Sequence, residues 1–190
     1  FETLYLADAE LTLDNRRVSQ AGQNGIIERS FRVRYENGIE IERTLESETE
    51  VQAVQDQIIS YGTNVVIRTV DTPGGPVEYW RKLRVYATSY HPAALGGDNI
   101  TSIGMELRKG IIGIEPHIIP YRTNMYVPGY GQGIAADTGL PRHNPYWVDL
   151  GYTDDDWVSW SRWVDVYLLT PVPADITYLL PTRAEGGPIP

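Results

Sequence analysis

Three short stretches decide the fold of the second half of the chain: GIIGIEPHIIP at residues 110–120, AADTG at 135–139 and WVDLG at 147–151. Each contains a short apolar run that is interrupted or ended by Gly, Pro or an acidic residue. Runs of the same kind occur at 83–90, 124–127 and 163–169. Several short strands separated by turn residues favour a small closed β-barrel over a sandwich of long strands.

The first 70 residues show a different strand pattern. Asn-Gly pairs at residues 24–25 and 37–38 are typical of tight hairpin turns, because both residues tolerate positive φ. Residues 31–35 alternate apolar side chains with Arg, and a third extended run at 43–54 alternates Thr and Val with Glu. The period of two predicts a thin β-meander that is half-buried on one face. On its solvent face a row of Arg is expected opposite a row of Glu.

A turn-rich joint, DTPGGP, separates these two patterns. All five Trp lie beyond the joint, and aromatic enrichment of that kind builds a compact core or a ligand groove. We therefore expect a mainly β chain with a meander at 1–70, a linker at 71–82 and a barrel at 83–170. The tail at 171–190 is rich in Pro and Gly and is expected to be extended and loose.

Composition excludes several classes of protein. The chain has 190 residues, no Cys, and 16 basic against 25 acidic side chains, which gives a net charge of −9. Without thiols there is no disulfide framework, Cys-ligated metal or thiolate nucleophile. The acidic balance argues against a nucleic-acid partner. No apolar stretch approaches the roughly 20 residues that span a bilayer, so we expect a soluble protein that does not insert into membranes.

Acidic and imidazole side chains do not form a pattern typical of metal ligands. The Asp run at 154–156 follows Thr153, and this order predicts a helix over 153–161 with Thr153 as N-cap and the acids in the first turn. Adjacent Asp residues on a helix point in different directions, so they do not converge on one ion. His91, His117 and His143 share no ligand spacing. We expect no metal and no cofactor.

Carboxylates are the better candidates for chemistry. Asp137 and Asp149 each lie in or at the end of an apolar run, and Glu115 follows a third such run. Burial of such an acid raises its pKa toward the range useful to a general acid. The alternative is a carboxylate that accepts backbone N–H bonds at a turn, and spacing alone does not separate the two interpretations.

Several motifs in register resemble the three-aspartate (3D) domain over about residues 83–170. They are TSIG at 101–104, the 110–120 stretch, MYVPGYG at 125–131, AADTG at 135–139, VDL at 148–150 and WVDVY at 163–167. That family resembles the six-stranded double-psi β-barrel of membrane-bound lytic transglycosylase A. Upstream, AGQNG at 21–25, YENG at 35–38, SET at 47–49 and YGT at 61–63 look like the G-five (G5) domain. The same pairing occurs in resuscitation-promoting and stationary-phase cell-wall proteins of bacteria.

This resemblance implies a secreted protein that remodels peptidoglycan in the cell wall. Separately from the resemblance, we expect a monomer, although the sequence leaves the oligomeric state open. Its partner would be peptidoglycan glycan strands, with the first domain as an adhesive or spacer module. The family's three acids correspond to Glu115, Asp137 and Asp149. Asp149 matches the single general acid and base of a lytic transglycosylase, which cleaves the β-1,4 bond between N-acetylmuramic acid and N-acetylglucosamine and leaves a 1,6-anhydro end. Expected substrate contacts are a hydroxyl from Thr101 and sugar-stacking faces from Tyr86, Tyr90, Tyr130 and Trp147.

Two departures from the family pattern keep a second hypothesis open. Glu115 stands where the family has Asp, and LPRHNP at 140–145 replaces a small, Gly-rich stretch with one residue inserted. One extra methylene or a bulkier loop can misplace a carboxylate by an ångström. The alternative is a non-catalytic wall-binding or scaffold module in which the barrel is retained and turnover is lost.

Overall fold

A computed structural model describes residues 1–96, 99–139 and 144–181. The chain divides into two units between Asn64 and Val65, whereas the sequence pattern placed the boundary at residue 70. Residues 65–70, which precede the predicted boundary, already belong to the second unit, because β6 (Arg68–Val70) pairs with β7 (Val77–Tyr90). The linker predicted at 71–82 therefore includes the first part of β7.

The first unit contains a three-stranded sheet in the order β1-β5-β2. Strand β5 (Gln57–Asn64) lies between β1 (Thr3–Thr12), which is parallel to it, and β2 (Arg16–Gln20), which is antiparallel. Gly62 permits the close approach of β1 to β5, since an added Cβ would lie 2.0 Å from the carbonyl oxygen of Thr12. The sheet thus depends on one position without a side chain.

We expect Gly62→Ala to destabilise the first unit by about 2–3 kcal/mol, because the obstructing atoms are backbone and cannot rotate away. Far-UV circular dichroism during thermal unfolding measures this loss. Every Trp lies at or beyond residue 80, so the Trp fluorescence transition of the second unit serves as an internal reference and should not move. Gly74→Ala is the control, because the nearest atom to its added Cβ is 3.7 Å away.

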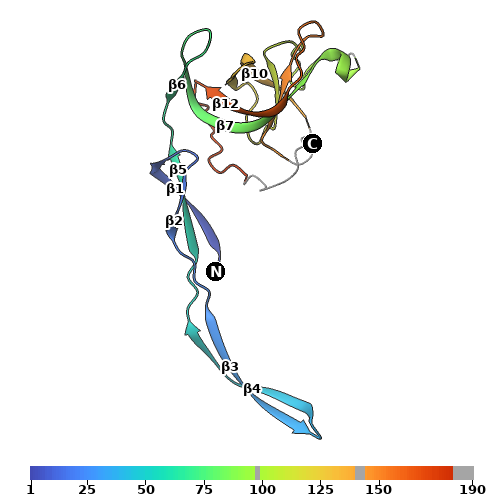
Figure 1. Cartoon of the computed structure of the whole chain (residues 1–190). Coiled ribbons are helices and arrows are strands. Elements are labelled where there is room, and N and C mark those ends of the chain that lie inside the picture. The colour runs from blue at the N-terminus through green and yellow to red at the C-terminus, as the bar shows by residue number, and fades with distance from the viewer. Residues whose placement is uncertain (97–98, 140–143, 182–190) are drawn as a thin grey trace. The chain divides into compact units, whose positions relative to one another are not determined.

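Strands β3 (Ile26–Glu36) and β4 (Ile39–Gln52) form a long two-stranded hairpin in the same unit (Figure 1). The turn between them is the predicted Asn-Gly pair, with φ of 54° at Asn37 and 80° at Gly38. The other predicted hairpin turn, at residues 24–25, is wrong, because β2 pairs with β5 and not with β3. The third run of the predicted meander is also wrong as a separate strand, because it continues β4.

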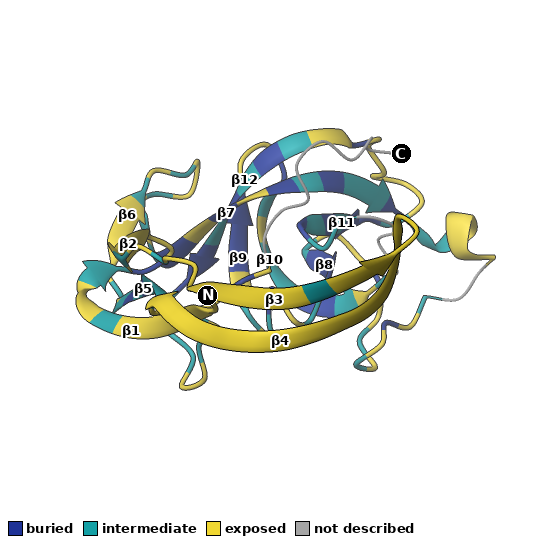
Figure 2. Cartoon of the chain, turned by 90° about the horizontal axis from the view of Figure 1, so that it is seen from below, coloured by how far each residue is buried: buried dark blue, intermediate teal, exposed yellow. Residues whose placement is uncertain are grey.

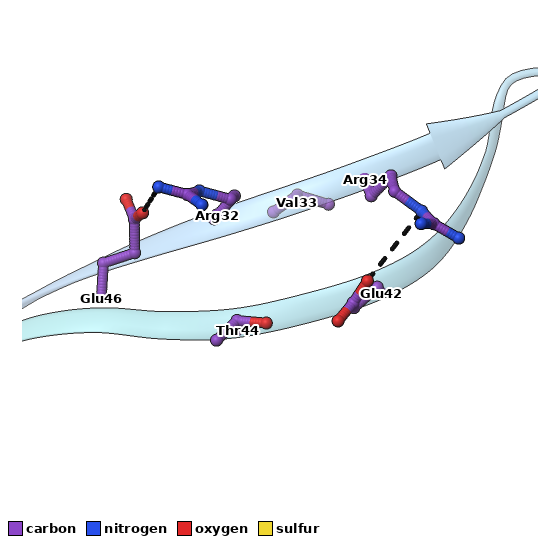
Figure 3. Close-up of a pocket in the computed structure, with 6 residues that line it drawn as sticks. All are labelled: Arg32, Val33, Arg34, Glu42, Thr44 and Glu46. Atoms are coloured by element: carbon purple, nitrogen blue, oxygen red, sulfur yellow. Dashed lines mark ion pairs between the residues drawn. The ribbon is translucent and has the colours of Figure 1, made fainter.

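The hairpin is exposed on both faces, which corrects the prediction of a half-buried face (Figure 2). A ribbon of two strands has no second layer to cover either side. The predicted opposition of Arg and Glu is confirmed, as Figure 3 shows for two pairs. Cross-strand ion pairs join Arg29 to Glu48, Arg32 to Glu46 and Arg34 to Glu42. Exposed pairs of this kind contribute at most about 1 kcal/mol each.

The second unit contains a closed six-stranded β-barrel, as the sequence predicted. The remaining elements are a 3-10 turn η1 (Pro92–Leu95), β8 (Ile111–Ile114), β9 (Asn124–Val127), β10 (Gly131–Thr138), β11 (Trp147–Gly151) and β12 (Ser161–Leu169). The closed circuit runs β7-β11-β8-β10-β9-β12 and back to β7. Two neighbours in it, β7 with β11 and β8 with β10, are parallel, and the other pairs are antiparallel.

Residues that alternate along the barrel strands are the most completely buried, except at Ala135 and Ala136, where the pairing of β10 with β8 shifts register. Side chains with no exposed surface are Val85, Ala87, Ile112, Ile114, Met125, Val127, Ala135, Ala136, Val148, Leu150, Val166 and Leu168. In β7 and β11 the residues between them are half-buried or exposed, so these strands turn their alternate side chains to the outer wall.

Two local predictions for this unit are wrong. The helix over 153–161 is absent: residues 154–156 form a turn, and β12 begins at Ser161. Asp156 closes this turn by accepting hydrogen bonds from the backbone N–H and the hydroxyl of Thr153. The prediction of a loose tail at 171–190 is wrong as far as residue 181, because Tyr146 donates to the carbonyl of Pro181 and Arg81 to that of Thr177. Residues 182–190 lie outside the described residues.

Candidate active site

Strand register places the two aspartates on either side of a glycine. Asp149 of β11 pairs with Gly113 of β8, and Gly113 pairs on its other side with Asp137 of β10. Thr88 of β7 extends this row beyond Asp149. Partnered residues of adjacent strands share one face of the sheet. The buried neighbours of Asp149 in β11 point into the barrel, so Asp149 lies on its outer wall. The fold therefore brings together two of the three acids that the sequence analysis singled out.

Gly113 leaves room for the acids. A Cβ at that position would lie 3.2 Å from the Cβ of Asp149, closer than nearly all such contacts. The glycine also separates the two carboxylates by one strand, since each aspartate is in the strand next to β8.

Asp137 is fixed by three donors. The hydroxyl of Tyr90 donates to Oδ2 at 2.8 Å, and the backbone N–H groups of Ser102 and Thr138 donate to Oδ1 at 3.0 and 2.9 Å. This is the turn-type arrangement that the sequence left open for each acid. Because its donors come from three segments of the second unit, Asp137 has a defined position and orientation.

Asp149 has a different environment. The hydroxyl of Thr88 donates to Oδ1 at 2.7 Å and is the carboxylate's one hydrogen-bond partner among the described residues. Burial raises the pKa of Asp149 from its ordinary value of 3.8 to about 6; the Thr88 bond opposes this rise and the charge of Asp137 adds to it. A carboxyl group with this pKa can hold a proton near neutral pH and release it.

Glu115 lies just beyond the end of β8. Its Oε1 is 2.7 Å from Nδ1 of His117 and accepts the backbone N–H of the same residue. Within the described residues its carboxylate forms hydrogen bonds with His117 and not with either aspartate. The third acid of the predicted set therefore does not share the row that Asp137 and Asp149 form.

Three of the predicted substrate contacts, Tyr130, Thr101 and Tyr90, are buried internal supports in this structure. The hydroxyl of Tyr130 donates to the carbonyl of Gly151 at 2.7 Å and accepts the N–H of Gly110 at 2.7 Å, and the ring is buried. The Thr101 hydroxyl accepts the backbone N–H of Met105, and this residue is also buried. Tyr90 is likewise buried, and burial raises the pKa of its hydroxyl, so it remains a neutral donor to Asp137.

Tyr86 and Trp147 form an aromatic row beside the acids. They are register partners on β7 and β11, and Trp163 of β12 pairs with Tyr86 on the other side. Tyr86 and Trp163 pack edge to face with ring centroids 5.6 Å apart. All three side chains are half-buried, and the row lies two residues along the strands from that of Thr88 and Asp149.

Two residues that contact the aspartates directly, Thr88 and Ser102, were not predicted from the sequence. Thr88 is a hydroxyl residue at an outward position of a strand-like run, but its partner is set by the parallel pairing of β7 with β11. Ser102 acts through its backbone N–H, which any residue except Pro supplies. Within the 140–145 stretch, residues 140–143, including His143, lie outside the described residues.

Among the described residues, no group of three His, Asp or Glu side chains is arranged to hold a metal ion. In the same part of the chain, no helix is long and apolar enough to cross a membrane.

The fold and the site define a two-unit β protein whose second unit is a barrel with paired aspartates on its wall. Residues 1–64, which are the whole of the first unit, match the G5 domain family. The chain is similar to two proteins of Bacillus subtilis (strain 168). It is 38% identical over 63 residues to the cell wall-binding protein YocH, and 29% identical over 134 residues to the putative cell wall shaping protein YabE.

These similarities cover 31% and 60% of this chain, but only 22% of YocH and 31% of YabE. The chain thus spans less than a third of the length of either relative. No solved structure matches the chain significantly.

Proposed function

We propose that this protein acts at the bacterial cell wall, outside the membrane, with peptidoglycan glycan strands as its partner. The G5 domain at residues 1–64 supports this proposal, as do the names of the two relatives, one a cell wall-binding protein and the other a putative cell wall shaping protein. In this proposal the G5 domain is an adhesive or spacer module, and the barrel is a 3D domain that contacts the glycan.

The second unit is proposed to be a lytic transglycosylase with Asp149 as its single general acid and base. The observation that carries this proposal is the pair of unlike carboxyl groups on one row. Asp137 is held by three donors, whereas Asp149 has a pKa raised to about 6 and a single partner on Oδ1. Two acids in contrasting environments are the usual arrangement for carboxylate chemistry on a glycosidic bond.

In the proposed reaction Asp149 begins protonated. It donates its proton to the glycosidic oxygen between N-acetylmuramic acid and N-acetylglucosamine, and the C1–O bond breaks as positive charge develops at C1. The resulting carboxylate takes the proton of the muramoyl 6-hydroxyl, whose oxygen attacks C1 and closes the 1,6-anhydro ring. One residue serves both steps, because the second step restores its proton. The negative charge of Asp137 raises the proton affinity of Asp149 and stabilises the cationic transition state.

Tyr86 and Trp147 are proposed to stack on sugar rings, with Trp163 extending the same row. Their half-buried aromatic rings lie on the outer wall next to the acids. Aromatic faces combine a large apolar area with little loss of conformational entropy, and so they suit the apolar faces of pyranose rings.

A non-catalytic wall-binding role is the second candidate. Asp137 is satisfied by backbone N–H groups, the Thr101 hydroxyl is occupied by Met105, and Glu115 does not join the row. These features would also occur in a barrel that binds glycan without cleaving it. The similarity to YocH, named as a cell wall-binding protein, favours this role as well.

Incubation with purified sacculi separates the two candidates. The transglycosylase is expected to release soluble muropeptides with 1,6-anhydro ends, which mass spectrometry distinguishes from the reducing ends left by a hydrolase. The binding module is expected to sediment with the sacculi and release nothing. Reducing ends without anhydro products would overturn the transglycosylase and leave a hydrolase.

A further inference from the structure

We propose that Trp147 and Thr88 are positioning residues that decide which oxygen of Asp149 carries the proton. In this arrangement Oδ1 is a permanent acceptor and Oδ2 is the atom that donates and receives the proton. The catalytic role in this inference rests on the proposed transglycosylase function. The hydrogen bonds that join Trp147, Thr88 and Asp149 are independent of that function.

The indole N–H of Trp147 is a hydrogen-bond donor and cannot accept. Nε1 of Trp147 lies 2.9 Å from Oγ1 of Thr88 and donates to it. The Thr88 hydroxyl thereby uses a lone pair for Trp147, and its own proton is directed to Oδ1 of Asp149 at 2.7 Å. The hydroxyl has a second lone pair, but Oδ1 is the acceptor of its proton among the described residues, so a neutral Asp149 that keeps this bond carries its own proton on Oδ2.

Strand geometry holds the three side chains in place. Trp147 and Asp149 are two residues apart in β11 and so lie on the same face, and Thr88 is the register partner of Asp149 in β7. The indole ring fits where two glycines have no side chain. A Cβ at Gly139 would lie 2.7 Å from Cη2 of Trp147, and one at Gly113 would lie 3.8 Å from the same atom.

Other ionisable groups around Asp149 are few and do not replace this chain of hydrogen bonds. Asp137 of β10 acts on Asp149 through its charge. Tyr90 of β7 faces the site, but its hydroxyl donates to Asp137. Tyr130, which follows β9, donates to backbone carbonyl groups. Thr88 is thus the described residue that can orient the carboxyl group of Asp149.

The test is a titration of the Asp149 carboxyl carbon by NMR in the full chain. Thr88→Val removes the donor to Oδ1, and Trp147→Phe removes the indole N–H that polarises the Thr88 hydroxyl and so strengthens its bond to the Asp149 carboxylate. Both changes favour the neutral acid, so each should raise the pKa of Asp149 by roughly 0.5–1 unit. Thr88→Ser retains the hydroxyl and should leave this pKa unchanged.

The direction of the shift distinguishes positioning from packing. If Trp147 only excluded water, its truncation would hydrate Asp149 and lower the pKa. An unchanged or lowered pKa in Trp147→Phe therefore overturns the proposal. In the Thr88→Val background Trp147→Phe should add no further rise, because both residues act through one hydroxyl. Thr88→Val keeps the shape of the side chain, so a pKa that does not rise in this variant overturns the proposal even if Trp147→Phe fails to fold.

The titration is independent of activity. If wild-type protein releases no anhydro product from sacculi while the pKa shifts appear as expected, the transglycosylase proposal fails and the positioning of the proton stands. If product is released but the pKa values do not move, the positioning inference fails alone.

Discussion

Asp149→Asn is expected to reduce the release of 1,6-anhydro muropeptides from sacculi by about 10³-fold. The amide cannot donate a proton to the glycosidic oxygen or take one from the 6-hydroxyl, and general acid–base catalysis typically contributes 10²–10⁴-fold. Asn keeps the size of the side chain and an oxygen that accepts the Thr88 hydroxyl, so the outer wall should retain its structure. Mass spectrometry of the soluble fraction measures the loss.

The matched control is Asp165→Asn on β12. Asp165 is also a carboxylate of the barrel wall, but it pairs with Lys82 and Arg84 away from the aspartate row. This variant should release anhydro products at the wild-type rate, and both variants should sediment with sacculi. Undiminished product from Asp149→Asn would rule out Asp149 as the acid and base.

Local signals predicted the elements that depend on neighbouring residues in the chain. The Asn-Gly pair at 37–38 fixes a hairpin turn because both residues adopt positive φ. Each of the six apolar runs lies in one of the six barrel strands, and closure into a barrel lets each bury a face. The pair at 24–25 failed because β2 finds its partner in β5, which lies far along the chain.

The acidic run at 154–156 shows a second reason for failure. Asp is favoured both in the first turn of a helix and in an isolated turn, because its side chain binds nearby backbone N–H groups in either setting. Here Asp156 binds back to Thr153, and Asp154 accepts the backbone N–H of Ala93 and contacts the His91 ring. Contacts with a segment some 60 residues away hold the turn, and no local pattern contains them.

The candidate site was predictable in its acids but not in the groups that tune them. Asp137 and Asp149 stood out because each is a charge within an apolar run. Their difference comes from register, since Tyr90 reaches Asp137 and Thr88 reaches Asp149 although both residues lie in β7. Which donor meets which acid follows from the parallel pairing of β7 with β11 and of β8 with β10.

Asp149→Asn is also expected to stabilise the second unit above pH 6. Burial raises the pKa of Asp149 from 3.8 to about 6, so between these values the folded chain holds a proton that the unfolded chain has released. Folding stability of the wild type therefore falls as pH rises through this window. A shift of this size corresponds to at most about 3 kcal/mol. Asn carries no charge and escapes this loss.

Measurements of folding stability at low and at neutral pH isolate the effect of the charge at position 149. A second variant, Asp165→Asn, is expected to change the stability in the opposite direction. Below about pH 4 the side chain at position 149 is neutral in both the wild type and Asp149→Asn, so their stabilities should be similar. At about pH 7–8 Asp149→Asn should unfold at higher denaturant concentration than the wild type. The fluorescence of the Trp residues, all of which lie in the second unit, follows this transition.

Hydrogen bonding to Lys82 lowers the pKa of Asp165, so its ionised form stabilises the fold, and Asp165→Asn should weaken the barrel above about pH 4. Equal pH dependence in the wild type and Asp149→Asn would contradict a raised pKa at Asp149, and with it the proton that the proposed reaction requires near neutral pH.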